Sequence, residues 1–361
     1  MVTGDNRKTA VSIASKLGMA GLNKEHAVLT SDEIAQMTDG QLSLCLKNIR
    51  VIARALPSDK SRLVRVAQEA GLVVGMTGDG MNDAPALKRA DVGFSMGSGT
   101  EVAKEASDIV ILDNNIASIA KAVLYGRTIF KSIRKFIVYQ LTMNFCAVSV
   151  SIIGPFIGID TPVTVMQMLW INIIMDTLAG MAFSGEPPLP EFMREAPKRR
   201  EEPVLNRAMT QQIFFDGIVT VALCLFFLCS PAVKRYFGFE QSMLPFLTAF
   251  FTLFIFSGVF NAFNARTPRL NLFAHLRKNL AFLFIMVSVI VIQVFMVYFG
   301  GSLFRTVGLS VQEMRLTLLI SMIIVPADLM RKTFCRSWKR PGIPQVKTRR
   351  KSKSALLRRY S

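Results

Sequence analysis

The chain has 361 residues, of which 51% are hydrophobic and only 19% charged, and this balance argues against a wholly soluble protein. Lys and Arg number 43 against 25 Asp and Glu, so the net charge of +18 favours an anionic partner, either nucleic acid or a membrane surface. The five cysteines include no CxxC pair, which predicts neither a zinc site nor a disulfide framework. The first residues lack the apolar stretch of a signal peptide, so we expect the N-terminal part to stay in the cytosol.

Residues 1–131 have the composition of a soluble α/β domain. Short β-rich runs predict strands at Ile49–Ala53, Leu72–Met76, Val92–Ser95 and Ile109–Leu112. Amphipathic segments between these runs predict helices at Ser58–Ala70, Asn82–Ala90 and Gly99–Ser107. Strands that alternate with helices are typical of a parallel sheet.

Residues 132–330 are predicted to form a membrane domain of six helices, because six apolar segments approach the length that crosses a hydrocarbon core of roughly 30 Å. The segments are Phe136–Ile159, Val163–Phe183, Ile213–Val233, Met243–Phe263, Leu280–Phe299 and Met314–Met330. Alternate linkers hold five and four Lys or Arg, whereas the others hold none, two and one. Since basic linkers stay in the cytosol, this pattern predicts a cytosolic soluble domain and C-terminus.

The tail, residues 331–361, has twelve basic residues and no acidic one. We interpret it as a cytosolic stop signal that also binds anionic lipid, which makes membrane lipid rather than nucleic acid the expected partner. A calmodulin-type target is the alternative that Trp338 suggests, but Pro341 and Pro344 would break the amphipathic helix that such a target requires.

Three segments of the soluble domain have the residue types of phosphate chemistry: TGD at Thr3–Asp5, Lys60, and MTGDGMNDAPALKRADVG at Met76–Gly93. Asp79 and Asp83 follow a predicted strand, at the sheet edge where open α/β folds bind their ligands. Their carboxylates suit Mg²⁺, while Thr3 and Lys60 would hold phosphoryl oxygens. A single GDG is ordinarily a tight turn, but the recurrence of these groups in one short domain favours a site.

This block resembles the hinge region of P-type ATPases in the haloacid-dehalogenase-like superfamily, and the resemblance continues through ADVGFSMGSGTEVAKEASDIVILDNNIASI. It implies a Rossmann-type fold for residues 1–131, as part of a phosphorylation domain. It also implies roles for six residues: Asp79 binds Mg²⁺, Asn82 and Asp83 support phosphate and metal, Lys60 neutralises the phosphoryl group, and Thr3 and Asp5 belong to the same site.

The nucleophile of that family, the Asp of a DKTGT motif, does not occur in the sequence. The nucleotide-binding domain, the actuator domain with its TGE loop and the first four membrane spans are also missing. We therefore interpret the chain as the C-terminal portion of a longer pump, inactive alone, whose main partner is the missing N-terminal portion.

Polar residues within the apolar spans predict a cation site. Asn172 and Asp176 lie four positions apart in MQMLWINIIMDTLAG and therefore share one helical face, and the first span adds Asn144. Together these side chains could form an oxygen cage, although Asn144 alone is equally consistent with a hydrogen bond between helices. Asp216, close to a cytosolic end, is predicted to lie at the membrane interface.

The spans resemble the last six of ten in P-type calcium pumps, and QMLWINIIMDT followed by EPPLP is most similar to the plasma-membrane calcium ATPase subgroup. The resemblance implies ATP-driven export of Ca²⁺ through an aspartyl phosphate, with Mg²⁺ as cofactor, proton countertransport and a cell-membrane location. Ala147 replaces an acidic ligand of the two-calcium relatives, and Met175 offers no hard oxygen, so one ion per cycle is expected.

Two alternatives remain at this point. One keeps the architecture and changes the ion to Mn²⁺, Na⁺, K⁺ or H⁺. The other is a membrane-anchored phosphatase or an inert regulatory half, although a phosphatase would need the absent nucleophile.

A coupling route is also predicted, in which one helix runs from Ser118 through Lys131 into Phe136 and joins the soluble domain to the first span. Gly126 is the weakest point of that helix.

Overall fold

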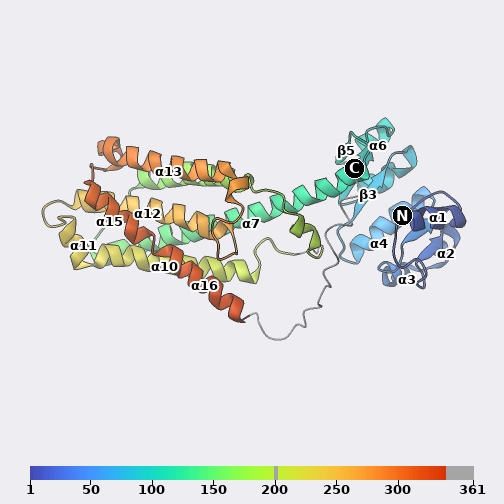
Figure 1. Ribbon diagram of the computed structural model, residues 1–361, viewed down its shortest axis with the longest axis horizontal. Helices are drawn as coiled ribbons and strands as arrows, with labels where there is room; N and C mark the ends of the chain where they lie inside the picture. Colours follow the sequence, from blue (N-terminus) through green and yellow to red (C-terminus); the bar gives the residue numbers. More distant parts are fainter. Residues whose placement is uncertain (199–201, 339–361) are drawn as a thin grey trace, which may run out of the picture. The chain divides into compact units, whose positions relative to one another are not determined.

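The computed structural model describes residues 1–198 and 202–338 (Figure 1). The chain divides into two units, each with its own apolar core. The first unit contains Met1–Arg134 and Glu186–Asn206, and the second contains Lys135–Gly185 and the chain from Arg207 onward. The loop of residues 186–206, between two predicted spans, therefore packs with the soluble domain.

The first unit contains two parallel sheets rather than the one sheet expected. Strand β1 (Val28–Thr30) pairs with β2 (Val51–Ala53), and Val2 adds an isolated parallel bridge to Ile52. Strands β3 (Gly75–Gly78), β4 (Val92–Met96) and β5 (Ile109–Ile111) form the second sheet in that order. Parallel pairing is confirmed throughout, but β1 was not predicted and β3 lies closer to the TGDG turn than expected.

Six helices surround these strands: α1 (Arg7–Lys16), α2 (Ser31–Gln36), α3 (Asp39–Cys45), α4 (Pro57–Glu69), α5 (Ala84–Arg89) and α6 (Glu101–Glu105). Local sequence explains where several of them begin. Thr30 and Thr38 are the N-caps of α2 and α3. The side chain of each accepts a hydrogen bond from the backbone N–H three residues later, and the side chain of that later residue, Glu33 or Gln41, accepts one from the backbone N–H of the threonine. Pro57 starts α4, where its missing N–H costs no hydrogen bond. Ala10 and Ala14 of α1 pack on Val51 and Ala53 of β2.

Helix α7 (Ile116–Ile153) begins in the first unit and continues without a break into the second. Its 38 residues correspond to about 57 Å at 1.5 Å per residue, almost twice a hydrocarbon core. Gly126 lies within it and causes no interruption. The predicted continuous helix is confirmed.

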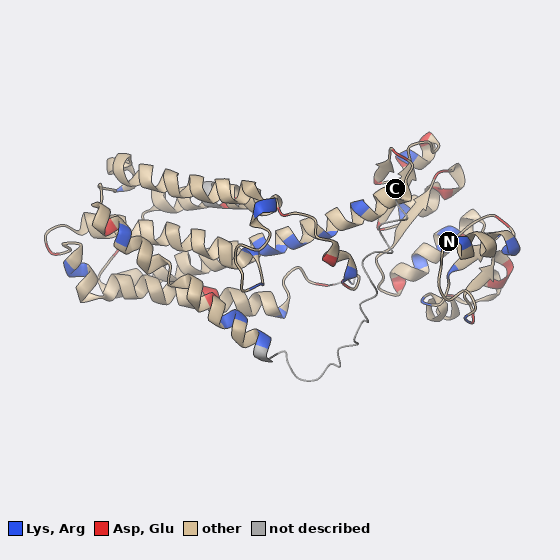
Figure 2. Ribbon diagram, in the orientation of Figure 1, with Lys and Arg blue, Asp and Glu red and all other residues tan. Residues whose placement is uncertain are grey.

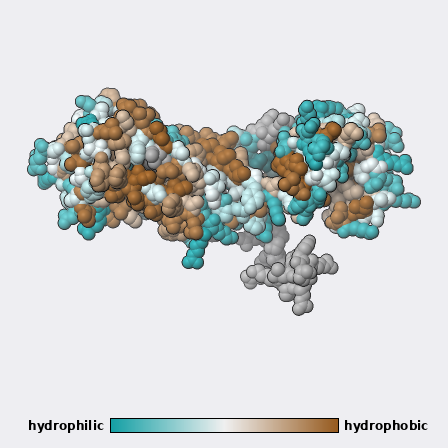
Figure 3. All heavy atoms as spheres, turned by 90° about the horizontal axis from the view of Figure 1, so that it is seen from above, coloured by the Kyte–Doolittle hydropathy of each residue, from teal (hydrophilic) through white to brown (hydrophobic). Residues whose placement is uncertain are grey.

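In the second unit, the described residues include five helical segments that are long and apolar enough to cross a membrane. They are α7, the succession α8 (Val165–Trp170), η3 (Ile171–Asp176) and α9 (Thr177–Ser184), then α10 (Arg207–Cys229), α12 (Met243–Arg266) and α13 (Leu280–Phe299). Figure 2 shows how sparse charged residues are along them, and Figure 3 shows the brown apolar side chains that cover them. Helix α12 is the most buried of the five and forms the centre of the core.

The sixth predicted span, Met314–Met330, is not one helix. It consists of α15 (Val311–Ser321) and α16 (Ile324–Trp338), separated by a turn at Met322 and Ile323. Pro326 explains the break, because proline has no N–H to donate to the Met322 carbonyl, which accepts from Val325 N at 3.0 Å instead. Helix α16 also includes the first eight residues of the predicted tail, and residues 339–361 lie outside the described part.

Short connecting elements complete the second unit: η2 (Gly154–Ile157), α11 (Pro231–Tyr236), η5 (Leu276–Lys278) and α14 (Gly301–Phe304). In the first unit, η1 (Met81–Asp83) precedes α5, and η4 (Pro190–Arg194) lies in the loop of residues 186–206.

Strand β4 packs closely against the backbone of Leu87 and Ser107 at Gly93, so we predict that Gly93→Ala lowers the stability of the fold. An added Cβ would lie 2.8 Å from the Leu87 carbonyl oxygen and 3.3 Å from Ser107 Cα, both backbone atoms that cannot move aside. We expect a loss of about 1–3 kcal/mol in the free energy of unfolding, measured by thermal unfolding in detergent. Gly126→Ala in α7 is the control: nothing lies within 4 Å, and alanine favours a helix by up to about 1 kcal/mol. Equal effects of the two changes would contradict this packing.

Candidate phosphate and cation sites

The structure brings Lys60 and Asp83 together. Lys60 lies in the first turn of α4, and its ammonium donates to Asp83 Oδ1 at the start of α5. The Asp83 carboxylate also accepts from the backbone N–H of Asp79 and Gly80, at 3.3 and 3.4 Å. Only 15% of the Lys60 side chain and 9% of the Asp83 side chain are exposed. This largely buried ion pair thus fixes the loop that follows β3.

Gly78 makes this arrangement possible. A Cβ at position 78 would lie 2.7 Å from Asp83 Cγ, so any larger residue would displace the carboxylate. Gly78, the first glycine of TGDG, is therefore required because the loop approaches Asp83 closely. It does not have a positive φ.

Two further predicted residues, Asp79 and Asn82, flank the pair with exposed side chains. The Asp79 carbonyl accepts from Thr100 N at 2.9 Å, which ties the loop to the start of α6. The Asp79 carboxylate thus lies at the carboxyl end of β3, open to solvent and suited to a cation that keeps several waters.

Thr3 and Asp5 form a second group, at the carboxyl end of β2. Thr3 Oγ1 donates to Asp5 Oδ2 at 2.9 Å, and the Asp5 carbonyl accepts from Arg54 N at 2.8 Å. Arg54 has a φ of 52°, a left-handed value uncommon outside glycine. No hydrogen bond or ion pair joins this group to Lys60 and Asp83 in the described part of the chain, so the predicted site residues form two groups.

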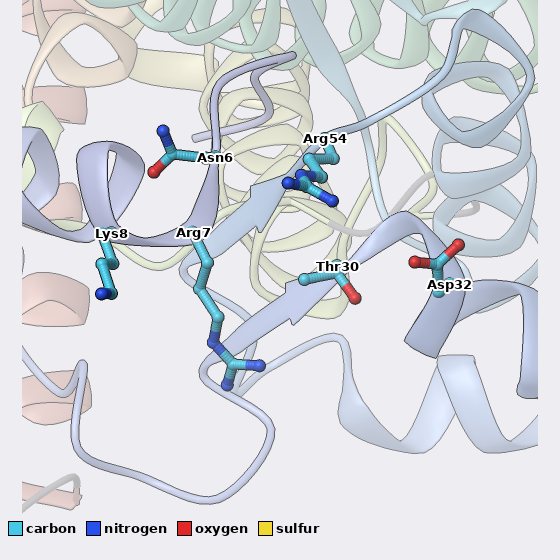
Figure 4. A pocket seen from close by; sticks show the side chains of 6 residues that line it. All are labelled: Asn6, Arg7, Lys8, Thr30, Asp32 and Arg54. Atoms are coloured by element: carbon cyan, nitrogen blue, oxygen red, sulfur yellow. The ribbon is translucent and has the colours of Figure 1, made fainter.

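A pocket of about 470 Å³ opens at the carboxyl ends of β1 and β2, beside the second group. Figure 4 shows its lining: Asn6, Arg7, Lys8, Thr30, Asp32 and Arg54. Three of these six residues are basic, so the pocket suits an anion, and sequence analysis did not single out any of the six. Neither Lys60 nor Asp83 lines it.

Two arginines of helix α4, Arg62 and Arg65, connect it to α3 and to the chain before α3. Arg62 donates to the carbonyls of Ile34 and Met37 and to Asp39 Oδ1, and Arg65 donates to Asp39 Oδ2 at 2.7 Å. Hydrogen bonds from Arg65 and then Arg62 hold the pKa of the Asp39 carboxyl below its usual value. These contacts fix the helix that carries Lys60.

In the second unit, Asp176 Oδ2 accepts a hydrogen bond of 2.5 Å from Gln140 Nε2 of α7. Asp176 is half-buried and ends η3, a π-helical segment that also contains Asn172. Such segments are rare within α-helices and are frequent at functional sites. Sequence analysis missed Gln140, although its position four residues before Asn144 is a signal that could have found it.

Asn144 and Asn172 are both exposed on the second unit, and no hydrogen bond links either of them to Asp176 in the described residues. The structure therefore joins Asp176 to Gln140 but does not close a cage around the three predicted ligands. No group of three or more His, Cys, Asp or Glu side chains gathers elsewhere within residues 1–198 and 202–338.

Asp216, for which the sequence predicted a position at the membrane interface, is 95% buried among charged side chains. Arg331 Nε of α16 lies 3.4 Å from Asp216 and 2.9 Å from Asp328, and Lys332 Nζ lies 2.5 Å from Asp328. Lys332 also donates to the Asn264 carbonyl of α12 at 2.9 Å. These partners were not foreseen, because Arg331 and Lys332, assigned to the tail, belong to α16, where Arg331 lies close to Asp216 of α10.

The part of α7 that precedes the first predicted span forms hydrogen bonds and ion pairs with the loop of residues 186–206. Arg127 of α7 donates to the carbonyls of Phe192 and Glu195, at 2.7 and 2.9 Å. Lys131 pairs with Glu195 at 2.5 Å, and Arg134 pairs with Glu202 at 3.0 Å. We call these contacts the α7 clamp.

Comparison with known proteins agrees with both units. Residues 160–334 match the family described as "Cation transporting ATPase, C-terminus", and residues 73–123 match "haloacid dehalogenase-like hydrolase". Residues 160–334 are thus similar to the C-terminal region of cation-transporting ATPases. The predicted membrane and dehalogenase-like regions are confirmed at this level.

The individual proteins that are similar to this chain include calcium-transporting ATPases of three organisms. Calcium-transporting ATPase 2 of Schizosaccharomyces pombe is 37% identical over 353 residues, covering 96% of this chain and 27% of that protein. Calcium-transporting ATPase 8, plasma membrane-type, of Arabidopsis thaliana is 38% identical over 340 residues, covering 92% and 32%. Plasma membrane calcium-transporting ATPase 4 of Homo sapiens is 37% identical over 337 residues, covering 87% and 27%. The chain spans about a third or less of these relatives, and the predicted resemblance to calcium-transporting ATPases is confirmed.

The Lys60–Asp83 pair predicts a specific loss of stability. Lys60→Met leaves the buried Asp83 carboxylate with two long backbone hydrogen bonds, which should cost about 1–3 kcal/mol of unfolding free energy. Lys104→Met is the matched control, because its partner Glu101 is 82% exposed and such pairs contribute at most about 1 kcal/mol. Thermal unfolding of both variants in detergent checks this, and equal losses would show that the pair is not buried in solution.

The Asp39 carboxyl predicts a pH dependence. Its pKa is lower in the folded chain than its ordinary value of 3.8, so the stabilisation is present above that value and is lost as pH falls through the lower folded pKa. We expect Asp39→Asn to unfold at a lower temperature than the parent at pH 7, and the difference to vanish in strong acid. Asp32→Asn, a change at an exposed position, is the control and should unfold close to the temperature of the parent at pH 7. A constant gap between Asp39→Asn and the parent would refute the assignment.

Proposed function

We propose that the chain is the C-terminal portion of a P-type pump that uses ATP to export Ca²⁺ from the cytosol. The main support is the Asp176 carboxylate, bound by Gln140 inside apolar helices of a chain that is similar to calcium-transporting ATPases. A carboxylate there is costly unless it serves a ligand or a partner, and its partner leaves further oxygen capacity.

The proposed cation ligands are Asp176, Asn172 and Asn144, to which we add Gln140. Gln140 Nε2 orients the Asp176 carboxylate, and its Oε1 has no hydrogen-bond partner within the described residues. Ca²⁺ takes six to eight oxygens, so four side chains leave room for backbone carbonyls, water and ligands from elsewhere in the complete pump. The exposure of Asn144 and Asn172 supports a missing span that packs against them.

One calcium ion per cycle follows from the same set. Ala147, one turn beyond Asn144, has no oxygen ligand in its side chain, and Met175 supplies only a soft sulfur. Asp176 is the one carboxylate among the four proposed ligands. Its single negative charge would leave two divalent ions poorly neutralised. No observation favours another transported ion.

In the first unit, we propose that Asp79 binds Mg²⁺, with Asn82 and Asp83 supporting metal and phosphate. The exposed Asp79 carboxylate suits an ion that prefers one or two carboxylates and several waters. When bound, Mg²⁺ would neutralise phosphoryl oxygens. Lys60 holds Asp83 in place and adds positive charge, while Thr3 and Asp5 present a hydroxyl and a carboxylate beside the carboxyl end of β2.

The nucleophile must come from a segment that the 361 residues do not contain, since no DKTGT occurs among them. Strand β3 pairs only with β4 in the described residues, so its other edge has no neighbouring strand there. A further strand that pairs there would carry its end beside Asp79, which supports an additional N-terminal portion as partner.

Coupling is proposed to run through α7, since one unbroken helix carries both the α7 clamp and the Gln140–Asn144 face. We also propose that α15 and α16 together make the sixth passage, with the first unit and the chain's end in the cytosol of a cell-membrane pump. The basic tail would then meet anionic lipid, as its composition predicts.

The test is Asp176→Asn in a complete pump that contains this chain. The change keeps the size of the side chain and removes its charge, so calcium-dependent phosphorylation by ATP should be abolished, with Mg²⁺-dependent phosphorylation from inorganic phosphate retained. Asp160→Asn, an exposed change between two spans, is the control and should leave both reactions as in the parent. An unchanged calcium dependence of Asp176→Asn would remove Asp176 from the ligands and overturn the proposal.

A further inference from the structure

Two cysteines that are 78 positions apart meet in the core of the second unit. Cys146 of α7 and Cys224 of α10 are both fully buried, and their sulfur atoms lie 3.9 Å apart. No spacing in the sequence indicates this pairing. The other three cysteines are different: Cys229 and Cys335 are exposed and Cys45 is half-buried.

The distance fits a bridging metal ion better than a disulfide. A disulfide requires a sulfur–sulfur distance of about 2.05 Å, so the two helices would have to approach by almost 2 Å. An ion bound at about 2.3 Å from each sulfur would subtend an angle of about 116° at the observed separation, close to tetrahedral geometry. The observed sulfur–sulfur separation therefore already suits such an ion.

The surroundings supply further ligand atoms. Met143 lies one turn before Cys146 and Thr220 one turn before Cys224, so both face the same layer of the core. Asn261 of α12 connects them, since its Nδ2 donates to Met143 Sδ at 3.6 Å and to Thr220 Oγ1 at 3.1 Å. Its Oδ1 is buried and has no hydrogen-bond partner in the described part of the chain. An unpartnered buried acceptor is costly and is relieved by an ion or water.

We propose that Cys146 and Cys224 form a binding site for a thiophilic divalent cation, with Met143 sulfur as a third, weaker ligand. Binding replaces the two thiol protons: one M²⁺ and two thiols give a bis-thiolate complex and two released protons. The complex of two thiolates with a divalent ion is neutral, which suits an interior that excludes water. Soft sulfur ligands select against Ca²⁺ and Mg²⁺, so the site is distinct from the proposed transport site.

An ion at this site would tie α7 to α10 two residues from Asn144. This consequence rests on the proposed function: in a complete pump the ion would restrain the helix that carries a transport ligand and thereby inhibit transport. Binding itself requires neither ATP nor Ca²⁺, so a failed binding test and a failed transport proposal are distinguishable.

The experiment uses the full 361-residue chain in detergent micelles, with Cd²⁺ as the probe. We expect one Cd²⁺ per chain to remain after gel filtration, with ultraviolet absorption from thiolate-to-cadmium charge transfer and two protons released per ion. Cys146→Ala and Cys224→Ala should each weaken binding at least tenfold, and Met143→Leu should weaken it less. Cys229→Ala and Cys335→Ala are the matched controls and should bind as the parent does.

A second measurement avoids variants that fail to fold. In the parent chain, Cd²⁺ should protect Cys146 and Cys224 from alkylation during brief heating, with Cys229 and Cys335 still modified, as read by mass spectrometry. Three results would overturn the proposal: no retained Cd²⁺ in the parent, unchanged binding in Cys146→Ala with native helix content, or protection confined to the exposed cysteines.

Discussion

A carboxylate inside an apolar helix bundle must be paired, hydrated or bound to a cation, and this constraint organises the second unit. Asp176 meets it only in part, through one amide hydrogen bond from Gln140. Its remaining oxygen capacity and the Gln140 Oε1, which has no hydrogen-bond partner in the described part of the chain, are the features on which the proposed cation site rests.

The other buried charges of this unit are satisfied within the chain. Asp216 and Asp328 face Arg331 and Lys332, so two negative and two positive groups cancel. Such a cluster recovers its desolvation cost only through close pairing, and it contributes little net stability while fixing which helices meet. It anchors α16 on α10 and α12, whereas Asp176 has no ion-pair partner of this kind in the described residues.

Features of the fold that depend on neighbouring residues could be predicted from the sequence, whereas those that depend on contacts between distant segments could not. Apolar runs of span length are local signals, and they gave correct positions for the spans from α7 to α13. The predicted strand before the TGDG turn exists as β3, but it begins three residues later and ends two residues later than expected. The break at Pro326 was also local and should have been found from the proline itself. Strand β1 is followed directly by α2, and its last residue, Thr30, is also the N-cap of that helix, so the strand has no separate boundary signal in the sequence.

Contacts between distant segments were beyond sequence reasoning. Lys60 and Asp83 were both predicted as site residues, but their ion pair depends on how α4 packs against the loop after β3. Gln140 acquires its role only from the helix that faces it, and Cys146 and Cys224 only from the packing of α7 on α10. The separation of the strands into two sheets likewise depends on an edge partner that the alternation of strands and helices does not reveal.

The central claim, that hard oxygen ligands on α7 and η3 hold the transported ion, is tested most directly by a structure of the complete pump with Ca²⁺ bound. The account predicts density for one calcium ion within about 2.3–2.6 Å of the Asp176 carboxylate, with Asn172 and Asn144 in the same shell. A calcium ion bound elsewhere, with Asn144 and Asn172 facing lipid acyl chains, would contradict it.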